Sequence, residues 1–157
     1  MIRFTESVLV VNGISAAADL FNGNPTSDVI SLENFEKAVF ILQSKSSTGT
    51  ANIKVQAVSS AAGSDAENVP FYWSKKTTGG SDVWTAPALA VAADGIATIA
   101  GEDTIHVIEV DGRQLPDDMK YVQLKLTEVV NDPVAGGLTI LLMNGRYGSP
   151  FPVAIVE

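Results

Sequence analysis

Apolar and polar residues alternate with a period of two in short segments along most of the chain. In residues 51–58 (ANIKVQAV), Ile53, Val55 and Ala57 share one face and polar residues share the other. This pattern is typical of a strand with one buried and one hydrated face. Clusters of Gly, Pro, Asn, Asp and Ser interrupt the alternation about every ten residues. The pattern therefore predicts an antiparallel all-β domain.

No segment has the apolar period of a long helix, and roughly eight segments have strand character. We expect strands at residues 3–11, 29–32, 38–43, 51–58, 69–75, 104–110, 122–129 and 138–143. Turn residues predict that several of these strands pair locally. The polar segment 45–49 predicts a hairpin, Asp94-Gly95 predicts another within residues 88–101, and the last two strands are expected to form a pair.

The strand at residues 104–110 (TIHVIEV) differs from the others because neither of its faces is purely polar. Ile105 and Val107 lie on one side, whereas His106, Ile108 and Val110 lie on the other. A strand with apolar residues on both sides is typical of the centre of a sheet. We therefore expect this segment to be a central strand.

The fold class that follows is an all-β, antiparallel two-sheet sandwich, jelly-roll-like, with extended N- and C-terminal arms. A chain of 157 residues can bury roughly 70% of the surface that its unfolded form exposes, so residues 1–157 are expected to form a single domain. Residues 12–27 follow the turn signal Asn12-Gly13 and are expected to be an irregular loop or arm. Residues 149–157 (SPFPVAIVE) are expected to be a C-terminal tail.

The composition of the chain bears on the partners it could have. The chain is 46% hydrophobic and 18% charged, with a mean hydropathy of +0.21, so we expect apolar surface to be buried against a partner as well as in the core. The net charge is −8 and the basic residues are scattered, which argues against nucleic acid as a partner. No apolar run approaches the ~20 residues of a membrane span, and no signal peptide is evident, so no membrane contact is expected.

The residues that could carry catalysis are few. There is no cysteine, and the one histidine, His106, lies between apolar residues of a strand, where a structural role is expected. Three acidic pairs, Glu102-Asp103, Asp117-Asp118 and Glu128 with Asp132, adjoin turns, in which carboxylates bond to nearby backbone groups. A calcium loop or a glycosidase pair would need further ligands or a defined separation. We therefore predict no enzyme activity, no metal site and no cofactor.

Aromatic residues gather in and after the segment 69–75 (VPFYWSK). Trp73 and Trp84 could stack a sugar, or they could fill the core or a subunit interface, where aromatic residues are enriched.

The order of several segments resembles a group of small tailed-phage virion proteins that are encoded near the major capsid protein. The resemblance is in residues 2–12 (IRFTESVLVVN), 28–43 (DVISLENFEKAVFILQ), 45–57 (KSSTGTANIKVQA), 68–73 (NVPFYW) and 104–148 (TIHVIEV to NGRYG). It covers nearly the whole chain and lies in the order of these segments.

The resemblance implies a head decoration, or cement, protein that binds the outside of an icosahedral capsid and clamps neighbouring subunits. The implied partners are the major capsid protein and further copies of the chain, as a trimer in preference to a dimer. The implied location is the capsid exterior of the virion, after assembly in the host cytoplasm. The alternatives are a carbohydrate-binding sandwich on a virion or host, and a head-completion or tail component. The residues expected at interfaces are Phe151, Pro152, Val153, Ile155, Trp84, Trp73, Leu20 and Phe21.

Overall fold

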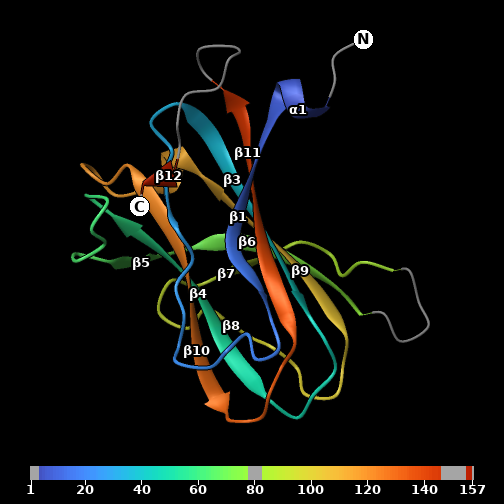
Figure 1. Cartoon of the computed structure of the whole chain (residues 1–157). Coiled ribbons are helices and arrows are strands. Elements are labelled where there is room, and N and C mark those ends of the chain that lie inside the picture. The colour runs from blue at the N-terminus through green and yellow to red at the C-terminus, as the bar shows by residue number, and fades with distance from the viewer. Residues whose placement is uncertain (1–3, 78–82, 146–154, 157) are drawn as a thin grey trace.

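The computed structural model describes residues 4–77, 83–145 and 155–156 as two antiparallel sheets packed face to face (Figure 1). Sheet A contains, in spatial order, β1 (Val8–Ala17), β11 (Gly136–Gly145), β3 (Phe35–Ser44), β9 (Thr104–Asp111), β6 (Phe71–Thr77) and β7 (Ala88–Ala90). Sheet B contains β12 (Ile155–Val156), β2 (Val29–Ser31), β10 (Tyr121–Val130), β4 (Thr50–Val58) and β5 (Glu67–Val69), and β8 (Ile96–Ala97) also pairs with β4. The described helices are short: α1 (Phe4–Ser7) and the 3₁₀ turn η1 (Gly112–Gln114). The predicted all-β sandwich is confirmed.

Most connections cross from one sheet to the other, and this overturns three predicted local pairings. Residues 45–49 join β3 of sheet A to β4 of sheet B, β7 and β8 lie in different sheets, and so do β10 and β11. Turn residues reverse the chain but do not decide which sheet receives the next strand. The predicted central position of residues 104–110 is confirmed, because β9 lies between β3 and β6.

One cluster of buried hydrophobic side chains fills the space between the sheets. Phe40 and Ile140 are fully buried in sheet A, as are Val55 and Leu124 in sheet B. The inner positions of each strand alternate with outer ones, as the period-two pattern predicts. Burial of each such side chain contributes about 1.5–3 kcal/mol.

The segment 12–27, predicted to be an irregular loop or arm, divides in two: residues 12–17 belong to β1, whereas residues 18–27 are irregular apart from one bridge between Thr26 and Lys125. β1 continues through Ala17, and its register with β11 shifts between Asn12 and Ile14. A Cβ atom on Gly13 would lie 2.8 Å from the side chain of Ile140, so glycine permits a bulge here instead of ending the strand. The Asn-Gly pair was therefore wrongly interpreted as a turn.

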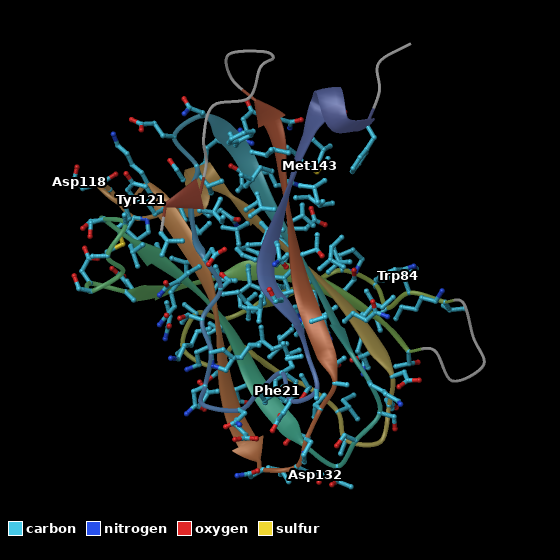
Figure 2. All side chains as sticks on the ribbon, in the orientation of Figure 1. Phe21, Trp84, Asp118, Tyr121, Asp132 and Met143 are labelled. Atoms are coloured by element: carbon cyan, nitrogen blue, oxygen red, sulfur yellow. The ribbon has the colours of Figure 1, made fainter. Side chains whose placement is uncertain are left out.

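Leu20 and Phe21 belong to the core and not to a subunit interface. They are 2% and 1% exposed, and the backbone N–H of Leu20 donates to the carbonyl of Val134 at 2.7 Å. Phe21 lies towards the lower end of the sandwich in Figure 2. Two large apolar side chains followed by the Gly-Asn-Pro turn hold this segment against its own sheets, so the interface prediction for these residues is wrong.

At the other terminus, β12 adds to the edge of sheet B, where Ile155 lies opposite Ile30 and Val156 opposite Val29. These two residues therefore extend the chain's own sheet. The other predicted interface residues of the tail, Phe151, Pro152 and Val153, lie outside the described residues. Among the helices that the structure describes, none is long and apolar enough to cross a membrane.

Candidate functional site: the outer face of sheet A

The outer side of sheet A carries a group of apolar side chains that polar residues interrupt: Glu109 lies between Val39 and Tyr72. The cross-strand register places Val10 of β1 beside Leu141 of β11, and Leu141 beside Val39 of β3. One row further along, Ile41 of β3 lies beside Val107 of β9. We call the group the apolar face, and its members are Val10, Val39, Ile41, Tyr72, Leu89, Ile105, Val107 and Leu141.

The apolar face is accessible in the isolated chain. Val10, Tyr72 and Leu89 are 48%, 49% and 57% exposed, and most of the central members are half-buried by their neighbours in the sheet. The outer side of an antiparallel sheet in a sandwich is normally polar. Exposed apolar residues gathered on such a side are typical of an interaction surface.

Charged residues lie at one end of the apolar face and, in the case of Glu109, within it, and they form ion pairs. Lys37 Nζ lies 2.8 Å from Glu109 Oε2, and Arg113 Nη2 lies 2.8 Å from Asp111 Oδ2. Hydrogen bonds from the Arg113 side chain and backbone lower the pKa of Asp111 to about 2. Both carboxylates therefore have their own cation, so the charges on this side of the sheet are balanced in pairs.

Two adjoining hollows lie at one end of the apolar face. The first has a volume of about 550 Å³ and is lined by β1, β11 and β3, with Ile14, Ala16 and Gly137 among its walls. The second, of about 510 Å³, shares Gln43 and Gly136 with the first. The strands approach closely here, since a Cβ atom on Gly136 would lie 2.3 Å from the carbonyl oxygen of Gln43. Gly137 contributes no side chain to the first hollow, whereas Ile14 and Ile41 form part of its walls.

The outer side of sheet B is polar and contrasts with the apolar face. Gln123, Gln56 and Asn68 lie side by side across β10, β4 and β5 and form a hydrogen-bonded ladder with two N···O distances of 3.1 Å. The neighbouring outward pair is Lys54 and Lys125, a placement of like charges that is tolerable in water. Sheet B therefore has the hydrated outer side that is expected of a sandwich, and sheet A does not.

His106 lies on the inner side of β9 and is fully buried. Its ring centroid lies 6.2 Å from that of Trp73, and within the described part of the chain neither ring nitrogen has a hydrogen-bond partner. Burial, together with the charge of Lys75 on the neighbouring strand, lowers the pKa of His106 to about 4. The imidazole is neutral near neutral pH and forms part of the core. These contacts agree with the structural role that its sequence context indicates.

Two residues of the acidic pairs, Asp103 and Asp132, accept hydrogen bonds from the loop of residues 45–49. Asp132 accepts hydrogen bonds from the hydroxyls of Thr48 and Ser47 at 2.7 and 2.8 Å, and these bonds lower its pKa. The backbone N–H of Ser46 donates to Asp103. Asp118 has a φ of +70° in the turn before β10, a conformation that Asp tolerates. Among the residues described, no three His, Cys, Asp or Glu side chains are grouped to hold a metal ion.

The two tryptophans lie on opposite sides of sheet A. Trp73 is opposite the buried Ile108, so it faces inward and packs against the core. Trp84 is 44% exposed and lies opposite Lys76, on the outer side (Figure 2). They do not form a common stacking platform. Trp84 instead lies at the margin of the apolar face, where an interface contact remains a prediction.

The apolar face was missed by sequence reasoning, although a signal for it exists. Residues 38–42 (AVFIL) and 138–143 (LTILLM) are nearly continuous apolar runs, and residues 104–110 lack a polar face. Such runs are typical of strands that are buried on both sides. Sequence does not show that the three strands are neighbours, because their pairing joins distant parts of the chain.

Comparison with known proteins identifies no family. No protein-family model matches the sequence, and no curated protein matches it. Among solved structures, the chain is similar to the crystal structure of the SPBc2 prophage-derived protein YomS, with 12% identity and a TM-score of 0.44. That alignment covers 87% of this chain and 93% of the other. At this TM-score the likeness supports no inference about role, so the function is argued from the apolar face itself.

Proposed function

We propose that this chain is a non-enzymatic structural protein of a tailed-phage virion, and specifically a decoration protein on the outside of the head. The observation that supports this best is the apolar face, a group of exposed apolar residues on the outer side of a sheet. The sequence resemblance in residues 28–57 and 104–148 supplies the phage context. The chain would assemble in the host cytoplasm and remain on the capsid exterior.

In this role, the protein stabilises the head by removing surface from water when it binds. The major capsid protein and further copies of the chain are the proposed partners. Binding to the assembled state alone stabilises that state by mass action, by about 2.7 kcal/mol when the free protein is present at 100 times its Kd. Such a mechanism uses a sheet face and needs no reacting group.

The test uses expanded phage heads prepared without this protein. We expect the purified chain to cosediment with these heads and to raise their melting temperature. Heads that already carry the protein serve as the control and should take up none. If the chain neither cosediments nor changes the melting temperature, the decoration role is wrong.

Counting copies per particle separates decoration from a head-completion or tail role. A decoration protein follows the capsid lattice and should be present in hundreds of copies, whereas a neck or tail component forms one ring of about a dozen subunits or fewer. Quantitative mass spectrometry of intact particles gives this number directly. The carbohydrate-binding alternative is not favoured by the structure, because Trp73 is turned into the core.

A further inference from the structure

The outer side of sheet A, which carries the apolar face, has the dimensions of a stable protein interface. Its long strands, β1, β11, β3, β9 and β6, have seven to ten residues each. At about 3.3 Å per residue and about 4.8 Å between strands, they present a surface of roughly 700 Å². A standard protein interface buries about 800 Å² on each partner. One sheet face of this size is therefore sufficient for a stable association.

The charge distribution favours a second copy of the chain as the occupant. Two chains with a net charge of −8 repel each other over most of their surfaces. Within and beside the apolar face, however, the cations Lys37 and Arg113 balance the carboxylates of Glu109 and Asp111. Contact through this face brings together the parts of the two chains that carry no excess negative charge.

The shape of the outer side of sheet A is also complementary to that of a second copy. Leu89 and Trp84 protrude on the β6–β7 side, and the hollow of about 550 Å³ lies on the β1 side. A two-fold axis in the plane of the interface and parallel to the strands exchanges these two sides. Trp84 of each copy, which is level with Lys76, would then lie over the hollow of the other copy. Two sheet faces can pack about 10 Å apart in this way, as they do inside a sandwich.

We propose that the apolar face is a self-association surface on which the apolar face of a second copy packs, giving a two-fold symmetric dimer. This inference rests on the interaction role proposed above and names the partner of that surface. Identical faces in mutual contact form an isologous pair. The structure thus favours a dimer as the basic unit, in place of the trimer that the sequence resemblance implies.

The test is sedimentation equilibrium of the purified full chain and of matched variants. Val107→Lys places a charge at the centre of the apolar face, whereas Thr127→Lys places the same charge on the exposed outer side of sheet B. We expect the unchanged chain and Thr127→Lys to be dimers and Val107→Lys to dissociate with a Kd raised roughly 100-fold. Trp84→Ala should also raise the Kd, by about tenfold or more.

Far-ultraviolet circular dichroism and thermal unfolding report whether each variant folds. If Val107→Lys does not fold, Val10→Lys decides the question, because Val10 is 48% exposed and a lysine there has room. The proposal is overturned if the unchanged chain is a monomer at about 100 µM, if it is a trimer, or if both lysine variants remain dimers.

Binding of the same proteins to undecorated heads distinguishes this inference from the proposed function. A dimer that has no affinity for heads would support the self-association surface and contradict the decoration role. A monomer whose binding to heads is abolished by Val107→Lys would support decoration and assign the apolar face to the capsid protein. If the unchanged chain both dimerises and binds heads, and Val107→Lys no longer dimerises, the self-association surface and the decoration role are both supported.

Discussion

Acidification should destabilise the fold through His106. This histidine is fully buried, and its pKa is lowered from 6.5 to about 4 by burial and by the charge of Lys75. As the pH falls below 6.5, the unfolded chain binds a proton at this position and the folded chain does not. Stability is therefore retained above 6.5 and is lost progressively until the pH reaches about 4, where the folded form also binds the proton.

The size of the effect follows from the two pKa values. The difference between 6.5 and about 4, at ~1.36 kcal/mol per pH unit, corresponds to roughly 3 kcal/mol. This is a large part of the ~5–15 kcal/mol that stabilises a typical domain. The pKa of Asp111 is also lowered, from 3.8 to about 2, but the stability that this carboxylate contributes is lost mainly below 3.8, so His106 dominates in the upper part of the range.

Urea unfolding at a fixed protein concentration measures this loss. The fluorescence of Trp73, whose ring centroid is 6.2 Å from that of His106, reports the transition. We expect the free energy of unfolding to fall as the pH is lowered from 6.5 to about 4, and His106→Leu to remove this dependence. Leucine also replaces two ring nitrogens that lack partners among the described residues, so the variant should be no less stable near neutral pH. Equal pH dependence in the two proteins, or an NMR titration of His106 near 6.5, would refute the reasoning.

Three further substitutions test other parts of the structure. Phe21→Ala should lower the free energy of unfolding by about 3–5 kcal/mol in chemical denaturation, because Phe21 is 1% exposed; a loss confined to self-association would instead support its earlier assignment to an arm. Gly136→Ala should lower stability by about 1–3 kcal/mol, since the added Cβ would lie 2.3 Å from the carbonyl oxygen of Gln43; an unchanged melting temperature would contradict this. Asp132→Asn should lower the melting temperature slightly, through weaker bonds to the 45–49 loop, and leave head binding unchanged. Loss of head binding in a folded Asp132→Asn protein would place this turn at the interface.

The fold class could be predicted from sequence because it depends on local patterns. Alternation in residues 51–58 and 122–126 identified the buried sides of β4 and β10 correctly. The assignment of strands to sheets could not be predicted, because β3 and β4 are neighbours in sequence and lie in opposite sheets. Their separation depends on pairing with β9, β10 and β11, which are far away in the chain.

The candidate site was predictable only in part, for the same reason. The unusual strand at residues 104–110 was recognised, but it forms a surface only because β3 and β11 lie beside it. The opposite error was made for Leu20 and Phe21. These apolar residues lie in a segment without a strand pattern and were predicted to contact a partner, but they are buried in the core. Composition indicates that apolar surface exists, whereas its location depends on long-range pairing.

The polar ladder on the outer side of sheet B has a practical consequence for peptide display. Gln123, Gln56 and Asn68 satisfy one another there, and the adjacent loop, residues 59–66, connects β4 to β5 and is closed by hydrogen bonds between Ser59 and Asp65. Foreign sequence inserted near Gly63, between those two residues, would be carried on the hydrated sheet, away from the apolar face. The chain thus offers one side for assembly and an independent side for cargo.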